Sequence, residues 1–385
     1  MVPIQYNVRS LFVRKVTTLA TAFGIALVVF VAAGSLMLGE GVSRAVETGS
    51  RDDTAIILRK GSDAELSSTL SNDILGLFRG HPQVSQAAGG GVIGEIVVVI
   101  TADRSDGSGI SNVLVRGTPP EGFAFRPEIR ITKGRAPKPG TNEVVVGEQI
   151  AGRFKGVGMG GQFELRRNRP LIVVGEFATT GTNGSEVIGD LDVIRRAVGR
   201  ESIVSSARVR LTDNSAFDAY RAAIEADKRF SAKVMRESDY FKKVAGQTSG
   251  FLLMLGGGIA FMFSIAAMLG AAITMNGAVA HRTREIGTLR ALGFSRFAIL
   301  FAFLLEAALL AAIGGGIGTL GAFFLSFLTF PVMNFQTFSE IVIGFPITGG
   351  LVIQTLIISV GMGLLGGLAP AIRAARIAPV EAMRG

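Results

Sequence analysis

Four long apolar stretches constrain the fold of this 385-residue chain more than any other feature of its sequence. About 20 consecutive apolar residues cross the hydrocarbon core of a bilayer as an α-helix, and each stretch reaches that length. The third is longer than one span requires, so we expect it to tilt, to break near Gly314–Gly316 or to project beyond the bilayer. We predict an α-helical membrane protein with four transmembrane helices, at residues 16–38, 251–275, 297–330 and 345–369.

The distribution of basic residues predicts the orientation of these helices. Lysine and arginine are concentrated at the cytoplasmic ends of membrane spans. Here they precede the first stretch within residues 1–15, and they recur in the segment 276–296 and in the tail 370–385. We therefore expect both termini and the 276–296 loop in the cytoplasm. Residues 39–250 and a short loop at 331–344 then lie on the opposite, periplasmic side.

The N-terminal residues leave alternatives open. Apolar side chains in residues 1–15 recur at helical spacing, which fits a short helix in the membrane interface and equally a continuous extension of the first span. A cleaved signal peptide is a further alternative, because Val31–Ala33 provides small residues for cleavage. The length of the first stretch and the three later ones argue against cleavage.

The segment 39–250 has the pattern of a folded α+β domain, and at about 200 residues it is large enough to bury a core. Its strand candidates are rich in valine and isoleucine and are bounded by glycine, proline or aspartate. These candidates are Thr54–Lys60, Ile93–Thr101, Val113–Gly117, Glu143–Val146, Gln162–Leu165, Leu171–Phe177 and Ile203–Leu211.

Helices are also predicted in this domain. The first follows a capping-box pattern at Ser62–Glu65, and the others begin at Asp190 and after Asn214, which are acceptable N-caps. The predicted helices are residues 64–78, 190–199 and 215–229. Residues 39–50 and 236–250 contain no proline and can continue the neighbouring spans as a helical stalk.

Composition excludes several classes of site. The chain has no cysteine and two histidines, which rules out disulfides, thiolate metal sites and a multi-histidine site within one chain. The net charge of +9 falls mostly beside the apolar stretches, because residues 40–243 hold 29 basic and 26 acidic residues. We therefore predict no nucleic-acid binding. No phosphate-binding loop, serine-nucleophile elbow or zinc-protease motif is present, so we predict no catalytic, cofactor or metal residues on this chain.

The basic segment 276–296 lies between the second and third stretches, and its core favours a helix that ends at Gly293. A short charged helix between two spans is a surface on which a cytoplasmic partner can push. Residues 284–293, Arg-Glu-Ile-Gly-Thr-Leu-Arg-Ala-Leu-Gly, closely resemble the coupling loop of MacB/FtsX/LolE-type ABC transporter permeases. The tail Ala369–Ala382 also resembles that family's ending. Further resemblance lies at Val113–Gly117, Ile131–Arg135, Glu143–Gly147 and Phe163–Phe177.

The resemblance implies a permease of the mechanotransmitting type VII, in the bacterial inner membrane. ATP and Mg would be bound by a separate cytoplasmic ABC ATPase, present in two copies, with no cofactor on this chain. A second permease copy would complete a homodimer, and a periplasmic adaptor and an outer-membrane channel are further partners that the resemblance allows. The implied function is export or extraction of a lipid, lipoprotein, peptide or small molecule.

Two other functions remain open. An FtsX-like scaffold would control a periplasmic cell-wall hydrolase without transport, although that type usually has a smaller outer domain. A membrane-anchored sensor or enzyme would act through the outer domain alone.

The resemblance also assigns roles to residues. Arg284 and Arg290 would pair with acidic residues in a groove of the ATPase, while Ile286, Leu289 and Leu292 would pack into it. The alternative is a solvated basic loop that only sets the topology. The predicted ATPase-coupling residues are Arg284, Glu285, Ile286, Leu289, Arg290, Leu292 and Gly293, and those of the tail are Pro370, Arg373, Arg376 and Pro379.

Glu306 lies about ten residues into the third stretch, and an ionisable group at that depth suggests a functional role. We predict intramembrane coupling between helices. The alternative is a carboxylate near the headgroups or paired with a basic loop residue. Small-residue spacings at Ala266–Gly270, Gly314–Gly318 and Gly363–Gly367 favour close helix packing and fit the predicted homodimer.

Overall fold

The computed structural model describes residues 15–47, 51–87, 91–179, 182–334 and 339–378. These residues form two compact units. The helical unit comprises described residues up to 41 together with 250–329 and those from 344 onward, and the sheet unit comprises 42–249 and 330–343. The predicted interfacial helix at residues 1–15 falls almost entirely outside the described residues, as does Pro379.

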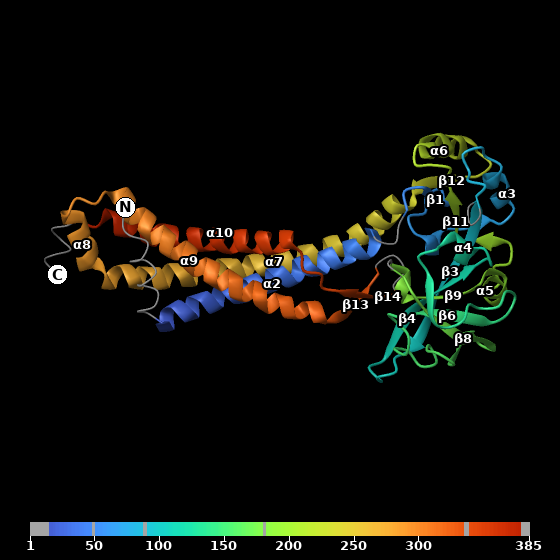
Figure 1. Cartoon of the computed structure of the whole chain (residues 1–385), viewed down its shortest axis with the longest axis horizontal. Coiled ribbons are helices and arrows are strands. Elements are labelled where there is room, and N and C mark those ends of the chain that lie inside the picture. The colour runs from blue at the N-terminus through green and yellow to red at the C-terminus, as the bar shows by residue number, and fades with distance from the viewer. Residues whose placement is uncertain (1–14, 48–50, 88–90, 180–181, 335–338, 379–385) are drawn as a thin grey trace. The chain divides into compact units, whose positions relative to one another are not determined.

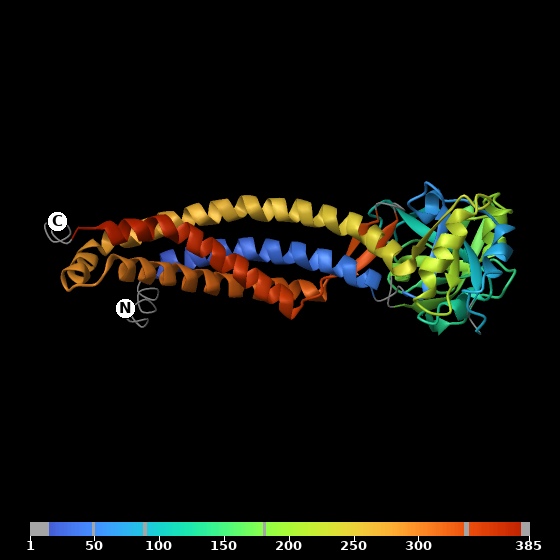
Figure 2. The same ribbon diagram turned by 90° about the horizontal axis from the view of Figure 1, so that it is seen from above.

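The helical unit is built from long apolar helices that run side by side (Figures 1 and 2). They are α2 (Lys15–Glu47), α7 (Glu237–His281), α9 (Arg296–Phe323) and α10 (Gly349–Arg376), with the short α8 (Thr283–Ala291) between α7 and α9. Within the described residues, four helices are long and apolar enough to cross a membrane. The first residues of α7 and the last of α2 belong to the sheet unit, so each helix continues from one unit into the other.

Glycines on α9 and α10 let these helices approach closely. A Cβ at Gly318 would lie 2.4 Å from the carbonyl oxygen of Ala26 on α2, and one at Gly363 would lie 2.4 Å from Ala311 on α9. The hydroxyls of Thr319 and Thr355 are 3.1 Å apart between α9 and α10. The predicted small-residue positions on α9 and α10 therefore pack against neighbouring helices of the same chain, whereas Gly270 on α7 has open space around it.

The third apolar stretch ends as a helix earlier than its length predicted. α9 is unbroken through residues 314–316 and ends at Phe323, and a 3-10 turn η3 (Phe324–Phe327) follows. Strands β13 (Thr329–Met333) and β14 (Glu340–Gly344) come next, so the segment 331–344, predicted as a loop, contains β14 and the end of β13. Pro331 lacks the amide hydrogen that a helix needs, and proline also favours an extended residue before it, so the apolar run cannot continue as a helix through residue 331.

A mixed sheet forms most of the sheet unit, in the order β12-β1-β11-β3-β4-β9-β6-β8-β5, with β7 paired to β8. Most neighbours are antiparallel, but β4–β9 and β6–β8 are parallel. The strands are β1 (Thr54–Arg59), β3 (Val92–Asp103), β4 (Ile110–Thr118), β5 (Arg130–Gly134), β6 (Glu143–Gly147), β7 (Gln162–Arg166), β8 (Arg169–Ala178), β9 (Glu186–Asp190), β11 (Ser206–Arg210) and β12 (Ala232–Arg236).

Helices pack onto this sheet around one apolar core. They are α3 (Ile74–Arg79), α5 (Leu191–Ala197) and α6 (Ala216–Ala226), with the single turns η1 (Glu65–Ser67), α4 (Gly122–Phe125) and η2 (Thr182–Ser185). Phe78, Ile194 and Tyr220 from the three helices are fully buried against the valine-rich strands. A two-stranded ladder joins β2 (Leu70–Ser71) to β10 (Ile203–Val204). The α+β fold predicted for this part of the chain is confirmed.

All seven predicted strands are present, and the last is divided at Ser205 into β10 and β11. Strands β2, β5, β9 and β12 were not predicted, and neither were β13 and β14. Asp190 caps α5 as predicted, because its carboxylate accepts the amide hydrogens of Asp192 and Val193. The start of α6 differs in detail, since Asp213 rather than Asn214 accepts the amide hydrogens there.

The helix predicted at 64–78 is wrong. The segment contains only η1, β2 and α3, and Glu65 does not cap a helix. Its carboxylate instead pairs with Arg116 and Arg208 in the interior of the sheet unit. Local capping chemistry was overridden by long-range charge pairing.

Candidate functional site

The segment predicted to couple to an ATPase forms helix α8. It ends as the sequence indicated, because Gly293 adopts φ of +93°, a left-handed conformation that costs glycine no steric energy. The amide of Phe294 donates to the carbonyl oxygen of Leu289 across this turn, at 3.2 Å. The Arg290 guanidinium also donates to the carbonyl oxygen of Phe294, at 3.1 Å. Arg290 therefore stabilises the end of α8.

The predicted apolar residues of α8 lie on different faces. Ile286 is only 2% exposed and packs against Val279, Ile299 and other residues of the helical unit, and Leu289 is half-buried beside them. Leu292 is 73% exposed. Ile286 thus contributes to the core of its own chain, and Leu292 is the apolar side chain presented outward. Arg284 and Glu285 are also exposed.

Glu306 pairs with Arg282 in the helical unit. The Arg282 Nη1 lies 2.9 Å from Glu306 Oε2, and each residue is only 7% exposed. The Arg282 guanidinium also lies 5.7 Å from the ring centroid of Phe303 and 3.4 Å from Glu285. Arg282 precedes α8 directly, so this buried ion pair holds the α7–α8 connection against α9.

Sequence reasoning did not name Arg282 as a site residue. Pairing of Glu306 with a basic loop residue was one of the alternatives, but Arg282 and Glu306 are 24 positions apart in the sequence. Several arginines of the loop were equally available. Only the packing of α7 against α9 selects Arg282.

The predicted tail residues lie at the end of α10. Pro370 is buried inside the helix, whereas Arg373 and Arg376 are exposed. Arg373 donates from Nη1 to Asn276 Oδ1 at 3.2 Å, which connects α10 to the last turns of α7. The tail and the coupling loop therefore belong to one surface region of the helical unit.

The sheet unit contains a buried charge cluster that the sequence analysis missed. Its members come from separate elements, and none is more than 8% exposed. They are Glu65, Glu95, Arg116, Arg126, Glu186, Arg208 and Glu237. A single arginine within an apolar strand, as in Val115-Arg116-Gly117 or Ala207-Arg208-Val209, was the available signal. Charges are rarely buried unless they are paired.

Arginine groups favour the ionised form of two carboxylates of this cluster, Glu65 and Glu95. Arg116 Nε lies 2.7 Å from Glu186, and Arg208 Nε lies 2.9 Å from Glu95. Burial alone would raise the pKa of Glu95, but the charges of Arg126, Arg116 and Arg208 outweigh it and lower that pKa to about 2. Glu65 is shifted in the same direction for the same reason.

Helix α7 begins inside this cluster. Glu237, its first residue, pairs with Arg208, and burial raises the pKa of its carboxyl more than Arg208 lowers it. The Tyr240 hydroxyl accepts the amide hydrogen of Glu65 at 3.2 Å. The Arg208 guanidinium lies 5.6 Å from the ring centroid of Phe241. The first turn of α7 is therefore fixed to the sheet unit by charge, hydrogen bonding and packing.

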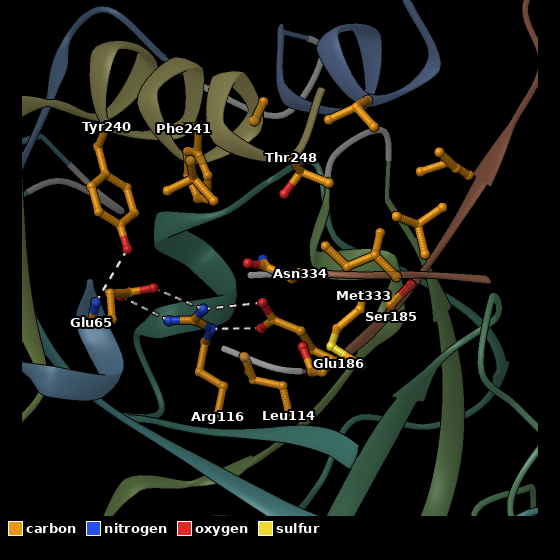
Figure 3. Close-up of a pocket in the computed structure, with 17 residues that line it drawn as sticks. Glu65, Leu114, Arg116, Ser185, Glu186, Tyr240, Phe241, Thr248, Met333 and Asn334 are labelled. Atoms are coloured by element: carbon orange, nitrogen blue, oxygen red, sulfur yellow. Dashed lines mark hydrogen bonds and ion pairs between the residues drawn. The ribbon is translucent and has the colours of Figure 1, made fainter. Parts of the chain in front are cut away.

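A small pocket lies over the cluster within the sheet unit (Figure 3). Figure 3 shows the Arg116 guanidinium between Glu65 and Glu186, with the Tyr240 hydroxyl directed at Glu65. The walls come mainly from α7, from strands β4 and β9 and from residues 332–334 and 339–343. The free volume is about 60 Å³, enough for a few water molecules. In this conformation the pocket is too small to hold a lipid, peptide or drug.

In the part of the chain that the structure describes, no group of three or more histidine, aspartate or glutamate side chains is placed to hold a metal ion. The carboxylates of the buried cluster face arginines instead.

Two family models match this chain. The model of the MacB-like periplasmic core domain matches residues 18–227, and that of the FtsX-like permease C-terminal matches residues 257–379. The first covers more than half of the chain. The chain belongs to the MacB/FtsX family of ABC transporter permeases. The resemblance that the coupling loop and the tail indicated is confirmed.

Individual relatives of this MacB/FtsX permease agree. It is 35% identical over 151 residues to an uncharacterized ABC transporter permease, YvrN, of Bacillus subtilis, covering 39% of this chain and 35% of YvrN. It is 29% identical over 240 residues to the macrolide export ATP-binding/permease protein MacB of Neisseria gonorrhoeae, and the match covers 58% of this chain and 35% of that protein. The MacB of Chlorobium luteolum is 26% identical over 417 residues, covering 99% of this chain and 60% of that protein.

The permease therefore spans between about a third and 60% of the length of these relatives. Solved structures similar to it include the periplasmic region of MacB from Actinobacillus actinomycetemcomitans. That match has a TM-score of 0.38 and 13% identity and covers 51% of this chain and 93% of the other. The extracellular domain of the transporter YknZ from Gram-positive bacteria matches with a TM-score of 0.37 and 15% identity. That match covers 47% of this chain and 99% of the YknZ domain.

Proposed function

We propose that this permease transmits the ATP-driven motion of an ABC ATPase subunit to the sheet unit, in order to export or extract a substrate. The observation that carries the proposal is helix α7. Its first residue, Glu237, is fixed in the buried charge cluster, and its last, His281, adjoins α8. A single helix of 45 residues offers a stiff connection between these two sites.

The ATPase would dock on α8. Leu292 is the exposed apolar residue, and the exposed Arg284 supplies positive charge beside it. In protein interfaces a few buried apolar residues usually supply most of the binding free energy, whereas rim charges affect the rate and specificity of association. Leu292 would enter the partner's groove, with Leu289 at its edge and Arg284 paired to an acidic residue. Ile286, Arg290 and Gly293 would keep α8 in shape.

The Arg282–Glu306 pair would carry movement of α8 to α9. Both groups are buried, and separating them would leave an uncompensated charge in an apolar environment. When α8 is displaced, α9 therefore has to move with it, because otherwise the buried ion pair would separate. This assigns Glu306 the coupling role predicted from its depth in the third apolar stretch.

The assembly we propose contains two permeases and two ATPases in the bacterial inner membrane. Both termini and α8 would lie in the cytoplasm and the sheet unit in the periplasm, in agreement with the basic residues beside α8 and at the end of α10. The substrate would be a lipid, lipoprotein, peptide or small molecule handled at the sheet unit. The pocket described above would be a packing site between elements of the sheet unit and would not bind the substrate.

Purification of the tagged permease from its native membrane, followed by mass spectrometry, tests this function. We expect an ABC ATPase to co-purify with the wild type and with the conservative control Leu292→Met. Replacement Leu292→Asp puts a charge into the proposed apolar contact, so recovery of the ATPase should fall about tenfold or more.

Two results would contradict the proposal. One is the absence of any ATPase under conditions that preserve other membrane complexes. The other is full ATPase recovery with Leu292→Asp, which would exclude α8 as the docking site. Co-purification of a cell-wall hydrolase without any transported substrate would favour the regulatory scaffold over transport.

A further inference from the structure

The segment between α9 and α10 forms a hairpin that belongs to the sheet unit. Strands β13 and β14 pair with each other, and the amide of Asn334 donates to the carbonyl oxygen of Ser339 at 2.9 Å. Residues 330–343 cluster with the sheet unit although their neighbours in sequence lie in the helical unit. Ser339 and Glu340 are only 3% and 5% exposed. A connection predicted as a short loop is therefore an integrated part of the sheet unit.

Glu340 is held between two arginines of the sheet unit. Arg153 Nη2 lies 2.6 Å from Glu340 Oε1, and Arg104 donates to Oε2. Arg104 directly follows β3, and a backbone bridge to Phe154 brings it beside Arg153. The amide of Ser105 also donates to the carbonyl oxygen of Arg153, at 2.9 Å. These backbone contacts hold Arg104 and Arg153 beside each other, and both guanidinium groups reach Glu340.

Two further contacts fix the hairpin. The amide of Val342 donates to Ser185 Oγ at 3.2 Å, and that hydroxyl donates to Gln149 Oε1 at 2.8 Å. Hairpin residues also share the pocket of Figure 3 with the first turns of α7, where Met333 and Asn334 lie with Thr248 along its wall. Both the hairpin and α7 therefore pack over the buried charge cluster.

We propose that Glu340, clamped by Arg104 and Arg153, is a second mechanical attachment between the membrane helices and the sheet unit. The inference rests on the proposed function, in which α7 provides the first attachment. Burial of a carboxylate is unfavourable unless charged partners compensate for it, and a loop that merely reversed the chain would not need one. Through the hairpin, α9 and α10 would be connected to the same sheet as α7. Glu340, Arg104 and Arg153 act as positioning residues.

Paired spin labels test the attachment in the full chain. Because the sequence has no cysteine, the exposed positions Met333→Cys on the hairpin and Arg166→Cys on β7 can be labelled selectively. Distances would be measured by pulsed electron paramagnetic resonance on the permease–ATPase complex in nanodiscs, with and without ATP. The variants are Glu340→Gln and the double replacement Arg104→Gln/Arg153→Gln, which removes the same contact from the other side. Glu164→Gln, an exposed carboxylate on β7, is the matched control.

We expect one narrow distance distribution in the wild type and the control. Both clamp variants should lose it and give a broad distribution, and the response of the sheet unit to ATP should fall at least severalfold. Combining the two variants should add little, because they break the same contact. Retention of the narrow distribution in Glu340→Gln would overturn the attachment. If the wild type binds no ATPase or shows no response to ATP, the proposed function fails, while the width of the distribution still decides the attachment.

Discussion

At the scale of single residues, both units place full charges where water is scarce. Arg282 and Glu306 do so in the helical unit, and the seven-residue buried charge cluster does so in the sheet unit. Buried ion pairs are weak sources of net stability, but breaking one by removing a single partner is costly. These groups therefore specify which elements must stay together when the protein moves.

Replacement Glu306→Gln leaves the Arg282 charge buried without its carboxylate partner. We expect the unfolding free energy to fall by about 3 kcal/mol, seen as a lower melting temperature of the purified permease in detergent. The double variant Arg282→Met/Glu306→Gln removes both charges and should recover much of that loss. Equal destabilisation by the single and the double variant would show that charge pairing is not the cause.

The stability of the sheet unit should depend on pH through Glu95. Its pKa in the folded protein is about 2, below its ordinary value of 4.5. Its contribution to stability is therefore complete above pH 4.5 and is lost as the pH falls towards 2, a loss of about 3 kcal/mol. Glu237 acts in the opposite sense, because burial raises its pKa and its contribution is lost as the pH rises.

Melting temperatures measured across the acid range check this prediction. The wild type and the exposed control Glu164→Gln should lose stability steeply on acidification. The Glu95→Gln variant should be less stable at neutral pH, since three arginines lose a partner. Its melting temperature should also change less as the pH falls. An unchanged acid dependence in Glu95→Gln would argue against this assignment.

At the scale of elements, α9 is the helix around which the helical unit packs. It contacts α2 through Gly314 and Gly318 and α10 through Gly315. Gly314 and Gly318 are required by the close approach of the α2 backbone, and Gly315 by the Ser359 side chain, and none of them by backbone conformation. The other face, at Gly316, has open space around it.

Replacement Gly318→Ala should separate α9 from α2. The new Cβ would lie 2.4 Å from the carbonyl oxygen of Ala26, which backbone cannot easily vacate. Overpacking of this kind costs about 1–3 kcal/mol, measurable as a lower melting temperature. Gly316→Ala, two residues away with nothing within 4 Å, is the control and should behave like the wild type. Similar stability of the two variants would refute close packing at Gly318.

Elements whose cause is local could be predicted from the sequence. Apolar length predicted the long helices, Gly293 predicted the end of α8, and segments rich in valine and isoleucine predicted seven strands. The failures have long-range causes. Glu65 left its predicted helix because Arg116, 51 positions away, pairs with it. Strand β14 and most of β13 lie in the segment 331–344, which was predicted as a loop. Pairs such as Arg282–Glu306 depend on helix packing, which no local pattern encodes.

At the scale of the whole molecule, α7 is, like α2, a helix shared by the two units. Proline inside a helix removes one hydrogen bond and clashes with the preceding turn, at a cost of about 3 kcal/mol. We therefore expect Gly250→Pro to interrupt α7 at the boundary between the units. The ATPase should still bind, because α8 is untouched, but the sheet unit should no longer respond to ATP.

Hydrogen exchange of the reconstituted complex measures this directly. In the wild type, ATP should change exchange both in α8 and in residues 42–249. In Gly250→Pro only the change at α8 should remain. Gly250→Ala is the control, since a Cβ at this position meets nothing within 4 Å. A full response of residues 42–249 in the proline variant would mean that α7 is not the transmitting element.

The discontinuity of the sheet unit also sets an order of events during synthesis. Residues 42–249 leave the ribosome first, but the hairpin that supplies Glu340 follows only after α9. Until then Arg104 and Arg153 lack the carboxylate between them, and the surface that receives β14 is uncovered. During synthesis the sheet unit is therefore incomplete, and it reaches its final form only after the third long apolar helix has been made.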